Sequence, residues 1–301
     1  MVDGGSSTTW SRTSTSSSTS EAAVARPAAL ARLVHPFPSI LDGLVVLAIA
    51  MLAGGEALTA LRLSASMTSL QFAIGALNDI IDAPADAGHV PPKPIPAGLI
   101  SKRSAGIVAC VAGLVGLALA APSGPGLLLL AVVVLGIGAA YDLVAKGTPW
   151  SWVPFAIGIP ILPVYGWFGV TAAVPGFFAI LVPMAVLAGA GLALANARVD
   201  AETDAAAGVD SAATRLGAER SWWANVALMA SATLIGVVFV GSTVWPPLTV
   251  VLIAIGTTLV AFGLSASRGS PAHARRRGWE AQAIGAGIAA VGWISAMLPR
   301  A

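Results

Sequence analysis

The sequence predicts an all-α, polytopic membrane protein in which a bundle of nine transmembrane helices surrounds a central cavity. The first observation is composition: the 301 residues are 56% hydrophobic and only 10% charged, and their mean hydropathy is +0.84. A soluble domain carries nearer to a quarter of charged residues. The second observation is that the apolar stretches are continuous, whereas the strands of a membrane β-barrel alternate between apolar and polar residues.

The third observation is the length of these stretches, since a helix needs about 20 residues to cross a bilayer and rarely fewer than ~17. The stretches that meet this requirement are 38–58, 63–82, 104–121, 126–145, 152–169, 175–196, 222–241, 246–265 and 281–298. The fifth contains Pro154, Pro160 and Pro163. Because proline removes a helical hydrogen bond, we expect this helix to be kinked or broken.

Residues 1–24 precede the first stretch and are rich in Ser and Thr, with almost no apolar side chains. Such a segment cannot bury enough apolar surface to fold, so we expect a disordered cytoplasmic tail. Residues 25–301 then form a single nine-helix transmembrane domain.

The basic residues indicate the orientation of the bundle. With the N-terminus in the cytoplasm, 14 of the 16 Lys and Arg residues fall on cytoplasmic segments, and only Arg62 and Arg300 fall on the other side. This bias follows the positive-inside rule. We therefore expect the inner (plasma) membrane of the cell, with the C-terminus on the far side. A formal net charge of +2 is too small to indicate a nucleic-acid partner, and the basic residues suit the head groups of membrane lipids better.

Two patterns of Asn and Asp residues end apolar stretches on the cytoplasmic side. They are Asn78, Asp82 and Asp86, and then Asn196, Asp200 and Asp204. A four-residue step nearly returns to the same face of a helix, so each motif is expected to point its side chains in one direction. Pro84 lies inside the first motif, which places Asp86 at the start of a loop.

Two acidic faces that meet in a bundle repel each other unless something cationic lies between them. Mg²⁺ carrying a diphosphate is the obvious candidate, because this ion takes carboxylate and phosphate oxygens. Four cytoplasmic-side cations are candidates to hold diphosphate oxygens: Lys93, Lys146, Arg198 and Arg215. For Lys93 and Lys146, a role as a positive-inside anchor is an equal alternative.

These residues resemble the UbiA superfamily of intramembrane prenyltransferases, over roughly residues 30–298. The resemblance rests on the first acidic motif, on Lys93-Pro94-Ile95-Pro96-Ala97-Gly98, on Tyr141 with Lys146, and on Asp200/Asp204 followed by Thr214-Arg215-Leu216-Gly217. One departure is Ala83, where many members of the superfamily have Arg, so a phosphate or acceptor contact is missing or moved.

The resemblance implies an enzyme in which both acidic motifs bind Mg²⁺ and the diphosphate of an allylic isoprenoid, whose tail lies in a channel open to lipid. The implied metal ligands are Asp82, Asp86, Asp200 and Asp204, and Asn78 joins them as a catalytic residue. The implied substrate-binding residues are Lys93, Tyr141, Lys146, Asn196, Arg198 and Arg215. Without the resemblance, Tyr141 would be assigned to an interfacial aromatic belt.

The expected reaction is transfer of an isoprenyl group to a small lipophilic acceptor, with release of pyrophosphate. An aromatic quinone precursor is the expected acceptor, because such molecules are the commonest acceptors in the superfamily. Within the enzyme class, action on a polar lipid precursor and cyclisation of the isoprenoid stay open because of Ala83. Ion or phosphate-compound transport is the alternative from another class. Transporters usually bind near the midplane on broken helices, whereas these acids gather at one side.

Overall fold

The computed structural model describes residues 27–87, 92–240, 245–269 and 271–298. Within these ranges helices are the only regular secondary structure and no strand is present, which confirms the all-α prediction. The predicted disordered tail at residues 1–24 lies outside the described residues, and so does the expected domain boundary at residue 25.

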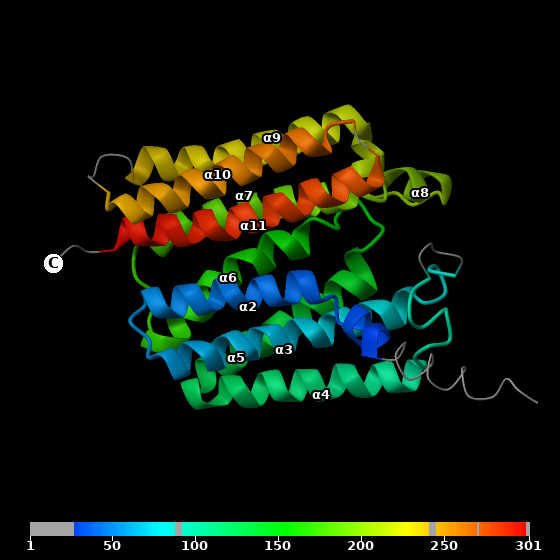
Figure 1. The fold of residues 1–301 in the computed structure, drawn as a ribbon, viewed down its shortest axis with the longest axis horizontal. Helices are drawn as coiled ribbons and strands as arrows, with labels where there is room; N and C mark the ends of the chain where they lie inside the picture. Colours follow the sequence, from blue (N-terminus) through cyan, green and yellow to red (C-terminus); the bar gives the residue numbers. More distant parts are fainter. Residues whose placement is uncertain (1–26, 88–91, 241–244, 270, 299–301) are drawn as a thin grey trace, which may run out of the picture.

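The long helices pack roughly along one axis (Figure 1). In chain order they are α2 (Pro36–Leu52), α3 (Ala57–Asp82), α4 (Lys102–Ala120), α5 (Pro125–Ala140), α6 (Val153–Thr171), α7 (Phe178–Ala197), α9 (Ala212–Val240), α10 (Pro247–Ser267) and α11 (Ala272–Met297). Shorter elements are a helix at Pro27–Leu33, the 3₁₀ turn η1 (Ala121–Ser123), the π-helical turn η2 (Tyr141–Ala145) and α8 (Ala201–Ala206).

Each of the nine predicted spans overlaps one long helix, but nine membrane crossings are not confirmed. In the described ranges, six helices are long and apolar enough to cross a membrane, or seven if Pro27–Leu33 and α2, bent by 61°, form one span. α3 and α11 are not among them, although each is 26 residues long. The chain is a multi-pass membrane protein.

The prolines of the fifth predicted span do not break it. Helix α6 runs from Val153 to Thr171 with Pro160 and Pro163 inside, both buried. Neighbouring helices can satisfy backbone groups that proline leaves without a partner, which is why such residues are tolerated in membrane helices. In the structure α6 lies against α2, α5 and α7.

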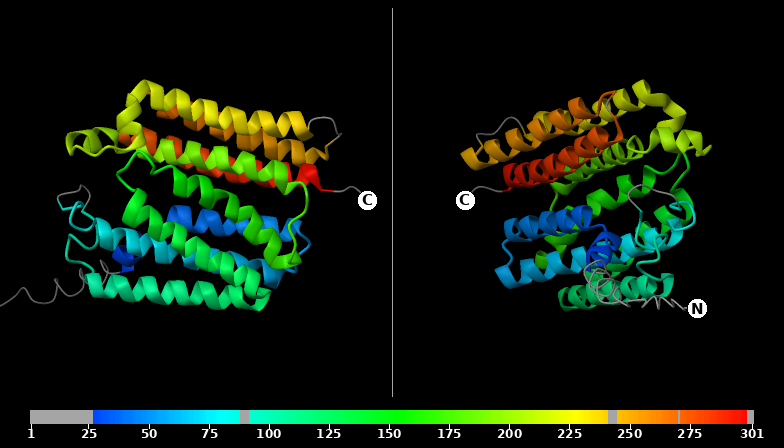
Figure 2. Two further views of the ribbon diagram at one scale, coloured as in Figure 1. Left: turned by 180° about the vertical axis from the view of Figure 1, so that it is seen from behind. Right: turned by 45° about the vertical axis from the view of Figure 1, so that its right-hand side comes forward.

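Small residues allow the helices of the bundle to approach closely. α10 and α11 lie side by side in every view (Figures 1 and 2). A Cβ atom added at Gly256 would lie 2.6 Å from the backbone nitrogen of Ala289 and 2.7 Å from the carbonyl oxygen of Gly285. Glycine at such contacts permits the tight packing that drives helix association in lipid.

The bundle places both acidic motifs at the same end. The end of α3 with the loop that follows it, and the short α8, project from the end of the bundle opposite the C-terminus (Figure 1). α2 and α6 lie between a layer formed by α3, α4 and α5 and a layer formed by α7, α9, α10 and α11 (Figure 2).

Candidate active site

The first acidic motif lies where α3 gives way to a turn. Asp82 is the final residue of the helix, and Asn78 lies one turn before it. The backbone nitrogen of Asp86 donates to the carbonyl oxygen of Asp82 over 2.9 Å. Asp86 therefore follows Asp82 by one helix-like turn, although it lies outside α3, as Pro84 led us to expect.

Two of the predicted phosphate-binding cations lie against this motif. Lys93 Nζ is 2.8 Å from Asp86 Oδ2 and 3.6 Å from Asp79 Oδ1, and Lys146 Nζ forms an ion pair with Asp82 Oδ2. Burial alone would lower the pKa of Lys93, but the hydrogen bond to Asp86 and the charges of the three aspartates raise it above its ordinary value. Lys93 thus stays cationic beside the motif.

Asp79, which breaks the four-residue rhythm, is almost completely buried, with 3% of its side chain exposed. Its Oδ1 atom lies 3.1 Å from His35 Nε2 and shares Lys93 with Asp86. His35 occupies the left-handed backbone conformation, with φ 48°, directly before α2. Asp79 therefore joins the start of α2 to the end of α3 next to the motif.

Asn78 contacts Asp142, a residue that was not predicted from the sequence. Its Nδ2 atom donates to Asp142 Oδ1 over 2.6 Å, and Asp142 is buried in the π-helical turn η2. Single π turns inside α-helices are frequently found at functional sites. The signal that could have revealed Asp142 is its position beside Tyr141 in an apolar span, because an acid at membrane depth is by default a functional candidate.

The second acidic motif is not carried by one continuous helix. Asn196 lies in the last turn of α7, the chain turns at 198–200, and Asp200 is the N-cap of α8, which contains Asp204. The nitrogen of Asp204 donates to the carbonyl oxygen of Asp200 over 2.8 Å. The single helical face that the spacing predicts is therefore interrupted between Asn196 and Asp200.

Tyr141 and Lys146 lie between the two motifs. Asp82, Asp200 and Asp204 all act electrostatically on the Tyr141 hydroxyl, and Lys146, which is paired with Asp82, also acts on Asp204. Burial raises the pKa of Asp204 above its ordinary value, the charge of Asp200 raises it further, and Lys146 opposes both. The structure thus brings together the motifs that the sequence separates by more than a hundred residues.

The other predicted substrate-binding residues have different surroundings. Arg198 is 4% exposed, and its guanidinium donates to the carbonyl oxygens of Ala218 and Ser267 and to the Ser221 hydroxyl. Arg215 forms an exposed ion pair of 2.8 Å with Asp210. Asn196 is half-buried. The contacts of Arg198 fasten the end of α7 to α9 and α10.

The donor set suits a hard divalent cation. In the described part of the chain, no three His, Cys, Asp or Glu side chains lie close enough to hold a metal ion by themselves. Mg²⁺, however, is usually bound by one or two carboxylates together with substrate phosphates and water. Asp142 Oδ2 is buried and has no hydrogen-bond partner among the described residues, so the site holds a carboxylate oxygen that can accept a further contact. The residues fit Mg²⁺ bound together with a diphosphate.

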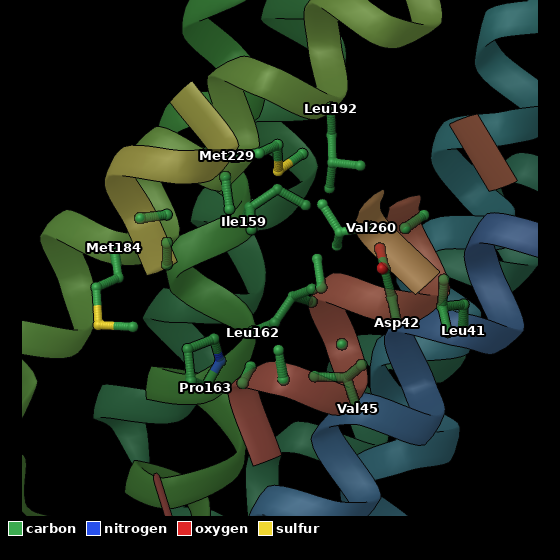
Figure 3. A pocket seen from close by; sticks show the side chains of 18 of the residues that line it. Leu41, Asp42, Val45, Ile159, Leu162, Pro163, Met184, Leu192, Met229 and Val260 are labelled. Atoms are coloured by element: carbon green, nitrogen blue, oxygen red, sulfur yellow. The ribbon is translucent and has the colours of Figure 1, made fainter. Parts of the chain in front are cut away.

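An apolar cavity of about 170 Å³ opens among α2, α6, α7, α9, α10 and α11. Figure 3 shows its wall, made mainly of aliphatic and methionine side chains such as Ile159, Leu162 and Met229. Phe155 also lines it and packs edge-to-face on Tyr141, with ring centroids 5.4 Å apart. The acidic site and the cavity therefore meet at the Tyr141–Phe155 contact.

A sequence profile of the UbiA prenyltransferase family matches residues 41–282, which include both acidic motifs and most of the bundle. The chain belongs to this family. The resemblance that the motifs indicated is thus confirmed. No curated protein sequence matches the chain.

Solved structures of UbiA homologues share the fold. One from Aeropyrum pernix K1, without ligand, has a TM-score of 0.68 and 21% identity, and covers 89% of this chain and 99% of its own. One from Archaeoglobus fulgidus, bound to GPP and Mg²⁺, has a TM-score of 0.68 and 19% identity, with coverages of 87% and 99%. A digeranylgeranylglyceryl phosphate synthase has a TM-score of 0.65 and 17% identity, with coverages of 90% and 98%.

Proposed function

We propose that this UbiA-family protein is a Mg²⁺-dependent prenyltransferase that moves an isoprenyl group from an allylic diphosphate to a small lipophilic acceptor and releases pyrophosphate. The observation that carries the proposal is the convergence of two acidic motifs on Tyr141 and Lys146, next to an apolar cavity. The A. fulgidus homologues bound to GPP and to DMAPP with Mg²⁺ support the choice of donor.

In this proposal Asp82 and Asp86 on one side, and Asp200 and Asp204 on the other, hold Mg²⁺ and the diphosphate between them. When bound, Mg²⁺ neutralises the charge of the leaving group without a proton transfer. Charge stabilisation in a preorganised, water-poor site is usually the largest catalytic term.

The lysines have a double role in the proposal. Lys93 and Lys146 compensate Asp86 and Asp82 while no substrate is bound. When a diphosphate and its metal enter, both ammonium groups turn to phosphate oxygens, and the carboxylates become available as ligands. Charge-assisted hydrogen bonds of this kind are among the stronger polar contacts in proteins.

Asn78, Tyr141 and Arg198 serve the geometry of the site. Asn78 holds Asp142, and the Tyr141 ring on Phe155 keeps water from the cavity, which protects an allylic cation from hydrolysis. The contacts of Arg198 support a positioning role for the second motif, and Asn196 and Arg215 stay proposed substrate contacts.

We propose that the acceptor is an aromatic molecule similar to a quinone precursor, because such molecules are the family's commonest acceptors. Ala83, which stands where many members have Arg, leaves action on a lipid precursor as the second candidate, in line with the structural likeness to a digeranylgeranylglyceryl phosphate synthase. We further propose nine membrane crossings in the plasma membrane, with the acidic site facing the cytoplasm.

The proposal is tested with the full chain reconstituted in lipid vesicles, with Mg²⁺, GPP or DMAPP, and a panel of aromatic and lipid acceptors. We expect mass spectrometry to show one acceptor that gains the mass of the isoprenyl group. A gain on a lipid alone would favour the second candidate, and an isoprenoid product without acceptor would indicate cyclisation. Flux of a phosphate compound across the vesicle membrane without any covalent change would refute the enzyme and favour a transporter.

A further inference from the structure

One carboxylate faces the apolar cavity from within the bundle. Asp42 on α2 lines the cavity, whose wall also includes the aliphatic side chains of Leu192, Val260 and Val45 (Figure 3). Asp42 belongs to neither acidic motif. Because an ionisable group at membrane depth is costly, it is kept there only with a partner or a function.

The partner of Asp42 within the protein is neutral. Gln71 on α3 donates from Nε2 to Asp42 Oδ2 over 2.7 Å. Among the described residues, Asp42 makes no other hydrogen bond and no ion pair. A carboxyl group keeps accepting capacity on its second oxygen whether or not it carries a proton. Asp42 therefore offers an acceptor to whatever fills the cavity.

The hydroxyl groups of the cavity wall, those of Thr233 and Thr257, already donate their protons to backbone oxygens. Thr233 donates to the carbonyl oxygen of Met229, and Thr257 donates to that of Ile253. Both bonds stay within the threonine's own helix. Asp42 is the one carboxylate among the described residues of the wall, and an ionised carboxylate accepts stronger hydrogen bonds than a neutral hydroxyl oxygen.

The depth of Asp42 in the bundle places it below the acidic site. Asp42 lies seven residues along the chain from His35, which contacts Asp79, and Gln71 lies seven residues before Asn78. At 1.5 Å per residue, both counts put Asp42 about 10 Å deeper than the first acidic motif. A molecule lying beneath the donor diphosphate in the cavity would reach it.

We propose that Asp42 is a positioning residue that accepts a hydrogen bond from a hydroxyl group of the lipophilic acceptor. The inference rests on the proposed function and adds a property of the substrate. The hydrocarbon tail of the isoprenyl donor has no group that can donate a hydrogen bond to a carboxylate, whereas a hydroxyl group on the molecule to be prenylated can donate one. A metal site is not formed, since no cluster of three potential ligands exists in the described residues. Asp42 therefore selects acceptors with a hydroxyl group and fixes how they lie.

The test uses the full chain in lipid vesicles and two probes of equal chain length, 4-octylphenol and octylbenzene. Binding is followed by quenching of tryptophan fluorescence, because Trp279 and Trp293 line the cavity. We expect the wild-type protein to bind the phenol about tenfold more tightly than the hydrocarbon, as one good hydrogen bond allows. Asp42→Leu, combined with Gln71→Leu so that no amide is left without a partner, should bind both probes equally well.

Thr257→Val is the matched control, since its hydroxyl is bonded within its own helix, and it should keep the preference. Asp42→Asn, which retains a carbonyl oxygen, should keep part of the preference for the phenol. Mg²⁺-dependent binding of GPP is measured on every variant, and its retention in the double variant shows that the fold is intact. A double variant that binds GPP and still prefers the phenol tenfold would overturn the role of Asp42. If the wild-type protein does not bind GPP, the proposed function fails, whereas the two probes still decide the role of Asp42.

Discussion

Lys146 connects the two acidic motifs at the scale of single residues. It pairs with Asp82 of the first motif and acts on Asp204 of the second, and its ammonium lies 5.9 Å from the centre of the Tyr141 ring. An interfacial anchor would need none of these contacts. The geometry therefore favours a phosphate-binding role for Lys146 over the anchor that the sequence left equally open.

Substitution Lys146→Met should raise the KM for the donor diphosphate by about 10- to 100-fold, because a hydrogen bond to a charged group contributes ~1.5–3 kcal/mol. Steady-state kinetics with varied GPP measure this. Lys102→Met is the matched control: Lys102 is an exposed residue at the start of α4. An equal rise of KM in both variants would contradict a specific role for Lys146.

The raised pKa of Asp204 has a consequence for metal binding. Burial and Asp200 make this carboxyl group take up a proton at a pH where an ordinary aspartate is still ionised. Protons and Mg²⁺ compete for carboxylates, so the Mg²⁺ dissociation constant should increase on acidification before the ordinary aspartate range is reached. Asp204→Asn should weaken Mg²⁺ binding and flatten its dependence on pH. Titration calorimetry at several pH values measures both, and an unchanged pH dependence in Asp204→Asn would contradict the assignment.

At the scale of helices, the packing of α10 on α11 depends on glycines at the contact. Gly256 leaves no room for a Cβ atom, which would meet the backbone of α11, whereas a Cβ atom at Gly136 on α5 would meet nothing within 4 Å. The two positions are chemically identical in the sequence. Only the packing of the neighbouring helix separates them.

Gly256→Ala should therefore lower the free energy of unfolding by about 1–3 kcal/mol, the typical cost of overpacking. Gly136→Ala should be neutral or slightly stabilising, since alanine is the better helix former. Unfolding of the detergent-solubilised protein by increasing denaturant measures both. Equal stability of the two variants would show that α10 and α11 can separate without cost.

The helices could be predicted from the sequence because apolar length alone determines them, and each expected span overlaps a helix. The break between α7 and α8 could not, since the step from Asn196 to Asp200 has the same spacing as that from Asn78 to Asp82. Asp142 and Asp42 were missed as well: an acid in an apolar stretch marks a candidate, but its partners, Asn78 and Gln71, lie on another helix and do not follow from spacing. Spacing shows which residues share a helix face, but not which helix lies opposite.

At the scale of the whole molecule, the number of crossings decides which side each loop faces. Nine crossings, with the N-terminus in the cytoplasm, place the loop between α2 and α3 outside and both acidic motifs inside. α3 and α11 are two predicted spans that are not among the helices long and apolar enough to cross a membrane. Their polar ends lie at the acidic end of the bundle (Figure 1).

Single cysteines in a Cys110→Ser background test this topology in intact cells. Glu56→Cys and Ala173→Cys should react with a membrane-impermeant maleimide, whereas Ala97→Cys and Ala206→Cys should react only after the cells are opened; all four positions are exposed. Reaction of Glu56→Cys and Ala97→Cys from the same side would mean that α3 does not cross the membrane.

The central claim is that the two acidic motifs act as one site. Mg²⁺-dependent release of pyrophosphate from GPP by the reconstituted protein, in the presence of its acceptor, tests this claim most directly. Asp82→Asn and Asp200→Asn should each lower the rate by about 100-fold or more, while Glu219→Gln, an exposed acid outside both motifs, should keep it. If Asp200→Asn retained the wild-type rate while Asp82→Asn lost it, the second motif would not belong to the site.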